Sequence, residues 1–328
     1  MRAAASSELH DFRGQPCAQL CLPQGDTVLI ALHGAQVVSW TTGDGRERLY
    51  VSPTASFDAV QPIRGGVPLC FPQFNQRVLA ELPLAKHGFA RTQLWAVQAL
   101  TATDTPDTPS AQATLALHSN AVTRALWPHA FAATLTVRLQ PGSLQVTFDV
   151  QNTDLAPWPF AVALHTYLRV EGIDGCTLHG LERRDFWDAV AHLAQPHVVS
   201  TQPDEALAFS GETDRVYSNV TTPLVVQHAG GTVQLTQSES LPDVVVWNPG
   251  ASRCAALDDM PPDGYQQMLC VEAACINTPV VLAPGQTWRG GSISAPFPRP
   301  NDLTPLFFLL ALFRLSLCLQ NASFPALT

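Results

Sequence analysis

Short apolar runs alternate with turn residues along most of the first 296 residues. Residues 26–40, DTVLIALHGAQVVSW, predict two short strands around a His-Gly-Ala turn. The runs at 133–139 and 143–152 alternate apolar and polar side chains around a Gln-Pro-Gly turn, which predicts a β-hairpin. The same pattern predicts further strands at 160–170, 222–228, 232–237, 243–249, 267–276 and 287–295.

Many strand-length runs with little helical periodicity are typical of an all-β protein. The sequence therefore predicts one large antiparallel β-sandwich with few short helices, over residues 1–298. Strands and helices do not alternate, which argues against a doubly wound nucleotide-binding sheet. The polar insert at 101–114 is predicted to be a surface loop. For the apolar tail at 299–328 a docked or interfacial helix is favoured.

Composition sharpens this picture. Twenty-seven prolines imply many turns and strand edges. The formal charge of −9 disfavours nucleic acid as a partner. The N-terminus lacks the apolar core of a signal peptide, so we expect a cytoplasmic location. The longest apolar run of the tail, Leu306 to Phe313, is shorter than the roughly 20 residues of a spanning helix, so no membrane partner is expected.

The eight cysteines lie at 17, 21, 70, 176, 254, 270, 275 and 318. Their C-x3-C and C-x4-C spacings could each supply half of a zinc site. Several lie in apolar runs, where free cysteine behaves as a small hydrophobic residue. We therefore expect reduced structural thiols, no metal and no cofactor, with any chemistry carried by His and Glu.

Two segments place cations among apolar or glycine residues. Arg64 lies in PIRGGVPLCFPQF, where its donor fork could bind a carboxylate or phosphate, or simply backbone carbonyls. The segment KHGFART brings Lys86, His87 and Arg91 within six residues. These three form either an anion site or a solvated basic loop.

Two further residues could transfer protons. In FAVALHTYLRV, His165 shares a strand face with Ala163 and Tyr167, and it is either a core histidine or a titratable acid or base. Glu272 is the one charged residue of the apolar run from Met268 to Ile276. Burial of a carboxyl group raises its pKa, which suits a general base, although a structural carboxylate is the alternative.

Taken in order, six motifs of this chain resemble the aldose 1-epimerase (mutarotase) superfamily, and within it the glucose-6-phosphate 1-epimerase branch. The motifs are IRGGVPLCFPQF, HGFART, LHTYLRV, TDRVY, VVVWNP and CVEAA, within a resemblance that spans residues 25–296. The resemblance implies a large antiparallel β-sandwich with a sugar site in a cleft on one face. It also implies interconversion of α and β anomers by opening and reclosing the hemiacetal ring.

The resemblance also implies roles for individual residues. His165 would be the catalytic acid and Glu272 the base. Arg64 and Arg91 would bind a phosphate, and Asp214 of TDRVY would bind sugar hydroxyls. Lys86 and His87 complete the expected substrate-binding set of Arg64, Lys86, His87, Arg91 and Asp214. Lys86 departs from the family, which commonly has Gln at this position.

We therefore expect a cofactor-free hexose-6-phosphate 1-epimerase that acts on glucose 6-phosphate as a monomer. Two alternatives stay open. One is an aldose 1-epimerase for unphosphorylated sugars, against which Arg64 and Arg91 argue. The other is a non-catalytic sugar-phosphate-binding protein, against which the presence of both His165 and Glu272 argues.

Overall fold

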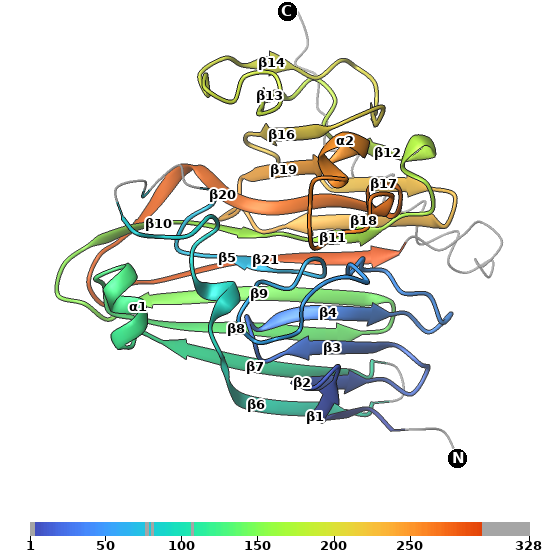
Figure 1. Ribbon diagram of the computed structural model, residues 1–328. Coiled ribbons are helices and arrows are strands. Elements are labelled where there is room, and N and C mark those ends of the chain that lie inside the picture. The colour runs from blue at the N-terminus through green and yellow to red at the C-terminus, as the bar shows by residue number, and fades with distance from the viewer. Residues whose placement is uncertain (1–3, 76–78, 80–81, 106–107, 297–328) are drawn as a thin grey trace, which may run out of the picture.

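The computed structural model describes residues 4–75, 79, 82–105 and 108–296, and antiparallel β-sheet makes up most of its regular structure (Figure 1). The α-helices in this part of the chain are short: α1 (Ala121–Leu126) and α2 (Gly250–Cys254). The all-β prediction with few helices is therefore confirmed. The predicted C-terminal tail at 299–328 lies outside the described residues.

The strands form three sheets. The N-terminal sheet has the order β1 (Ser6–Phe12), β2 (Gln15–Cys21), β3 (Thr27–Ala31) and β4 (Gln36–Thr41). The nine-stranded sheet has the order β15 (Leu207–Ala208), β12 (Thr177–His179), β17 (Leu224–His228), β18 (Gly231–Gln237), β21 (Thr287–Pro296), β9 (Ser143–Asn152), β8 (Phe131–Gln140), β7 (Ser110–His118) and β6 (Ala96–Thr103). The eight-stranded sheet has the order β14 (Ser200–Thr201), β13 (Asp185–Asp188), β16 (Thr213–Tyr217), β19 (Asp243–Asn248), β20 (Met268–Leu282), β10 (Trp158–Leu164) and β5 (Leu69–Cys70), with β11 (Tyr167–Arg169) paired to β20.

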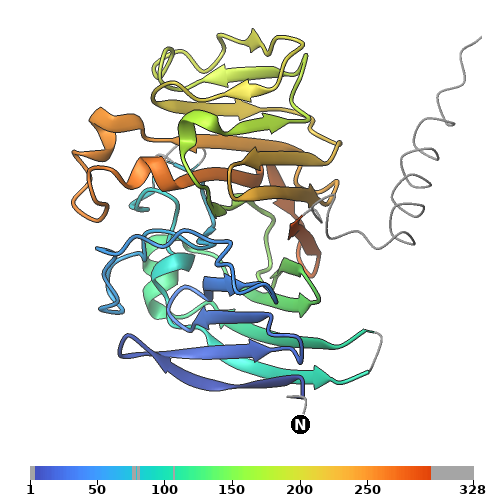
Figure 2. The ribbon, with the colours of Figure 1, turned by 90° about the vertical axis from the view of Figure 1, so that its right-hand side faces the viewer.

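The nine-stranded sheet is one layer of a sandwich, and the other two sheets cover it. Trp40 of the N-terminal sheet shares a buried cluster with Phe148 of β9, and Figure 2 shows the blue N-terminal strands beside the green ones. Val246 of β19 shares a second cluster with Val226 of β17. Burial of these apolar faces is the main stabilising contribution.

Residues 268–276 of strand β20 are buried on both faces, which explains the apolar sequence there, with Glu272 as its one charged residue. Leu269 and Val271 point into the sandwich core. Cys270 and Ala274 point to the opposite face, where loops and α2 cover the sheet. Because side chains alternate along a strand, Glu272 lies on this second face. The candidate site is built there.

The predicted strands at 222–228, 232–237, 243–249, 267–276 and 287–295 are confirmed as β17, β18, β19, β20 and β21, and two other predictions need correction. The turn at 26–40 and the hairpin at 133–152 form as expected. The predicted strand at 160–170 is interrupted at His165 and Thr166, between β10 and β11. The surface loop predicted at 101–114 is too long at both ends, since β6 runs to Thr103 and β7 begins at Ser110. The error arises because β6 is a sheet edge whose last three residues are exposed and include two threonines, as a loop would.

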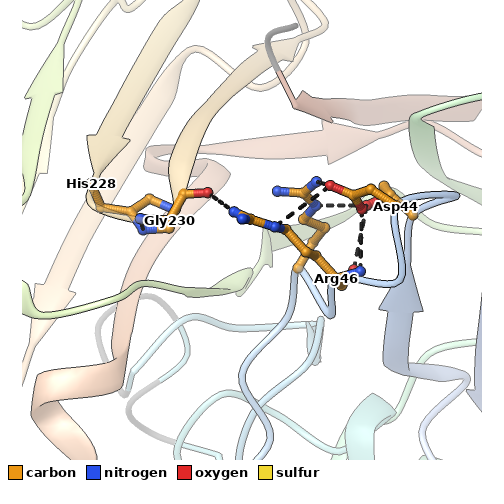
Figure 3. Close-up of polar contacts among 6 residues, drawn as sticks. Asp44, Arg46, His228 and Gly230 are labelled. Carbon is orange, nitrogen blue, oxygen red and sulfur yellow. Dashed lines mark hydrogen bonds and ion pairs between the residues drawn. The ribbon is translucent and has the colours of Figure 1, made fainter. Parts of the chain in front are cut away.

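The turn after β4 is tied to the β17–β18 turn of the nine-stranded sheet. Figure 3 shows the Arg46 guanidinium donating to the carbonyl of Gly230, while Asp44 holds the Arg46 backbone N–H at 3.2 Å. The Gly230 N–H donates to His228 Nδ1 at 3.1 Å. Burial lowers the pKa of His228, in keeping with an unprotonated Nδ1 that accepts this bond. The contact joins segments about 180 residues apart in sequence.

The seven described cysteines are free, which confirms the expected thiols among them, and Cys318 lies outside the described residues. No helix in the described ranges is both long and apolar enough to span a membrane.

We predict that Phe71→Ala strongly destabilises the fold. Phe71 is fully buried, and its ring contacts five other aromatic rings, those of Phe89, Trp127, Phe131, Phe148 and Phe160. Truncation should lower the free energy of unfolding by about 3–5 kcal/mol, measured by urea denaturation. Leu155→Ala is the control, since Leu155 is 96% exposed. Equal effects of the two variants would contradict this account of the core.

Candidate active site

His165 and Glu272 lie in direct contact in the covered face of the eight-stranded sheet. His165 Nδ1 is 3.2 Å from Glu272 Oε1, and the Glu272 side chain is 1% exposed. Glu272 Oε2 has no hydrogen-bond partner among the described residues. Since Nδ1 faces Glu272, Nε2 is the ring nitrogen left to face a substrate.

The break between β10 and β11 fixes the orientation of His165. Its backbone N–H donates to the carbonyl of Pro68 at 2.9 Å. Its ring stacks on that of Tyr167, with centroids 4.8 Å apart and planes 10° apart, which confirms the shared face. The ring of Trp247 packs edge-on against both of them.

Burial shifts both members of the pair toward their uncharged forms. Desolvation, and then the negative charge of Asp214, raise the pKa of Glu272 well above its ordinary value, while Lys86 opposes this shift. Desolvation lowers the pKa of His165 well below its ordinary value, and the positive charges of Arg91, Arg64 and Lys86 add to this effect.

Arg64 lines the same pocket and is held by two neighbours. Its Nε donates to both carboxylate oxygens of Asp259, at 3.1 and 3.0 Å, and its Nη1 donates to the hydroxyl of Tyr167 at 3.1 Å. The two glycines that follow Arg64 allow this placement. At Gly65 and Gly66, which have positive φ, a Cβ would lie 2.3 Å from the backbone oxygen of Tyr50 and 2.0 Å from that of Val37, respectively.

The KHGFART segment supplies one wall of the pocket. His87 is buried, its ring centroid is 5.5 Å from that of His165, and its Nδ1 accepts the Asn75 N–H at 3.3 Å. Desolvation and the nearby His165 hold its pKa well below the ordinary value, so Nε2 carries the proton. Arg91 is not among the lining residues; its guanidinium donates to the Lys86 carbonyl at 2.8 Å.

Six of the seven predicted site residues therefore line one pocket: Arg64, Lys86, His87, His165, Asp214 and Glu272. Asp214 comes from β16, where burial raises its pKa to about 6 against the opposing charge of Lys86. The sequence predictions did not name the other lining residues as site residues: Phe74, Asn75, Val245, Trp247, Arg253 and Leu257. VVVWNP was already a motif of the resemblance, and Arg253 follows it by four residues.

The pocket opens toward a larger one at the rim. The two share Asn75, Lys86, Asp214 and Arg253, and the outer pocket has a volume of about 420 Å³. This volume lies within the range of small-molecule sites. The reacting groups thus lie in the inner part, and three of the shared residues are charged.

His165, Cys270 and Glu272 offer donor atoms within 4.8 Å of one another, and such side chains can hold zinc. Burial and the Glu272 charge raise the pKa of Cys270 well above its ordinary value. Three neighbouring cations, Arg64, Lys86 and Arg91, oppose a further positive charge at this position. Proton transfer suits the pair better than metal binding.

A β-sandwich with a buried His–Glu pair in a polar pocket defines a class of acid–base enzyme that works on small polar molecules. Residues 16–293 match the family model described as aldose 1-epimerase, and the chain belongs to this family.

Relatives and solved structures agree with that assignment. A Cenchrus ciliaris protein named "Putative glucose-6-phosphate 1-epimerase" is 35% identical over 270 residues, which cover 80% of this chain and 78% of the relative. A Salmonella typhimurium protein of the same name is 34% identical, covering 76% and 80%. A crystal structure titled as a "putative mutarotase" from Salmonella typhimurium has a TM-score of 0.79 at 27% identity, covering 89% of this chain and 94% of the other.

We predict that Glu272→Gln stabilises the fold at alkaline pH. Since the native pKa of Glu272 is raised, the native state binds more protons than the unfolded state above pH 4.5, and wild-type stability falls as pH rises through that native pKa. The variant escapes this loss, by about 1.4 kcal/mol per unit of pKa elevation. Urea denaturation of both proteins between pH 5 and 9 measures the difference.

The matched control is Glu239→Gln, because Glu239 is exposed. This variant should follow the wild-type pH dependence. If Glu272→Gln follows it as well, the burial cost assigned to Glu272 is wrong.

Proposed function

We propose that this protein is a hexose-6-phosphate 1-epimerase that interconverts the α and β anomers of glucose 6-phosphate. The observation that carries the proposal is the contact of His165 with Glu272, whose second carboxyl oxygen is unpartnered among the described residues and buried in the pocket. Family membership and the names of the relatives support the same reaction class.

In this proposal each free atom of the pair has one task. Glu272 Oε2 accepts the proton of the anomeric hydroxyl, and His165 Nε2 donates a proton to the ring oxygen as the bond from C1 to that oxygen breaks. Both substrate oxygens are bonded to C1, so a contacting pair on one side of the sugar reaches both. Rotation about the C1–C2 bond then presents the other aldehyde face, and the reversed transfers close the ring.

The opposed pKa shifts fit this cycle. An imidazolium beside a carboxylate and a neutral imidazole beside a carboxylic acid hold the same number of protons. The first arrangement opens the ring, and the second is left beside the open-chain aldehyde. Burial favours the second arrangement, in which neither group is charged. The pair therefore holds the same number of protons before and after ring opening, and ring closure restores the first arrangement.

For the phosphate we propose Lys86 as the principal ligand, with Arg64, Arg91 and Arg253 nearby. Arg64 is paired with Asp259, and Arg253 lies 3.5 Å from Glu212. The Lys86 ammonium makes no hydrogen bond or ion pair to another described residue, and the side chain is exposed at the rim. An unpaired cation gains most from a dianion. His87 Nε2 and Asp214 are proposed to bind sugar hydroxyls.

We predict that the wild-type protein accelerates anomer exchange of glucose 6-phosphate above the spontaneous rate, and that Glu272→Gln lowers kcat by about 10²–10⁴-fold. The amide keeps the shape of the side chain but cannot accept the proton. Saturation-transfer NMR between the two anomeric protons measures the rate. A wild-type rate equal to the spontaneous rate would contradict the proposed function. Full activity of the variant would show that Glu272 is not the base.

We predict that removal of the Lys86 charge selectively impairs the phosphorylated substrate. Lys86 is the one lysine of the sequence, so acetylation of the wild-type protein neutralises this side chain and the N-terminal amine only. kcat/KM for glucose 6-phosphate should fall about 10–100-fold, since a charged hydrogen bond contributes roughly 1.5–3 kcal/mol. Activity on glucose should change little.

Reductive dimethylation is the matched control, because it modifies the same amines and keeps their charge. Acetylated Lys86→Arg controls for the N-terminus and should retain activity. Equal losses on glucose and glucose 6-phosphate would instead favour an aldose 1-epimerase for unphosphorylated sugars.

A further inference from the structure

Asp259, Arg64 and Tyr167 form a chain of contacts that ends on the His165 ring. Asp259 accepts two bonds from Arg64 Nε, Arg64 Nη1 donates to the Tyr167 hydroxyl, and the Tyr167 ring stacks on His165. Asp259 and Tyr167 do not line the pocket. We propose that Asp259 and Tyr167 are positioning residues, which hold the His165 imidazole in line with the anomeric centre through Arg64.

The chain joins segments that the fold brings together from far apart. Asp259 lies in the loop after α2, 195 residues from Arg64, and Arg64 in turn lies 103 residues from Tyr167. Tyr167 is 2% exposed and packs edge-on against Trp247, so its ring cannot turn without disturbing the core around it. We call Asp259, Arg64 and Tyr167 the clamp. Through these contacts, the position of the loop after α2 affects the position of the His165 ring.

Asp259 also balances charge around His165. The ring faces Glu272 from β20 and Tyr167 from β11, and the other charged or titratable groups close to it are Arg64, Lys86, His87, Arg91, Asp214 and Cys270. Arg64 alone would oppose a protonated His165, whereas the Asp259 carboxylate partly cancels that charge. The clamp thus acts on both the orientation and the proton affinity of the acid.

The inference rests on the proposed epimerase function, and two variants test it. Asp259→Asn keeps the side-chain shape but removes the charge, so kcat should fall about 10–100-fold, and both limbs of the pH–rate profile should move to lower pH. Tyr167→Phe keeps the ring stack but removes the hydroxyl, so kcat should fall while the limbs stay in place. Both losses should be equal for glucose and glucose 6-phosphate.

The neighbouring Asp258→Asn is the matched control, since Asp258 is exposed and makes no hydrogen bond or ion pair with another described residue. It should behave as wild type, and Asp259→Glu should recover part of the activity and the original pH profile. Thermal unfolding of every variant checks that the fold persists.

The possible failures are distinguishable. If wild-type protein is inactive, the proposed function fails, and NMR titration of the His165 ring nitrogens still tests the clamp, which requires a lower pKa in Asp259→Asn. If wild type is active and Asp259→Asn matches Asp258→Asn in rate and pH profile, the clamp is wrong. A loss confined to KM for the phosphorylated sugar would overturn it too, since Arg64 would then act on phosphate.

Discussion

The structure of the site depends on one costly arrangement, a carboxyl group buried in the middle of a sheet. Glu272 is 1% exposed on a strand whose other described positions up to Ile276 are apolar or thiol side chains. Desolvation alone would make it an inert carboxylic acid. The contact with His165 changes this, because an imidazolium beside a carboxylate carries no net charge, so the interior can also hold Glu272 in its ionised form.

The fold keeps that pair buried from both sides. The sandwich core lies beneath β20, and the loops around Arg64 and His87 cover its outer face. Close backbone approaches make this cover tight: Gly66 touches β4, and a Cβ at Gly88 would lie 2.1 Å from the carbonyl oxygen of Phe71. The glycines of IRGG and HGFAR therefore serve packing, and they place Arg64 and His87 beside the pair as a consequence.

Sequence reasoning predicted the all-β class and the principal hairpin, and six of the seven site residues that it named line the pocket. A lone carboxyl group in an apolar run is a strong local signal, and Glu272 was found by it. Arg253, Trp247 and Asp259 were missed as site residues because their roles arise from packing across the sheet. Asp259 and Arg64 are 195 residues apart in sequence. Two consecutive aspartates in a polar loop, Asp258 and Asp259, give no indication in the local sequence that one of them contacts Arg64.

Charge compensation explains why several cations in one pocket need not all bind substrate. Arg64 and Arg253 each face a carboxylate, at 3.0 and 3.5 Å, while Lys86 faces none within ion-pair distance among the described residues. A paired guanidinium positions its neighbours more than it attracts distant anions, because its partner cancels much of its charge at a distance. An unpaired ammonium at the rim attracts anions by its uncompensated charge. In the proposed function, the paired Arg64 therefore serves the orientation of His165, and the unpaired Lys86 attracts the phosphate.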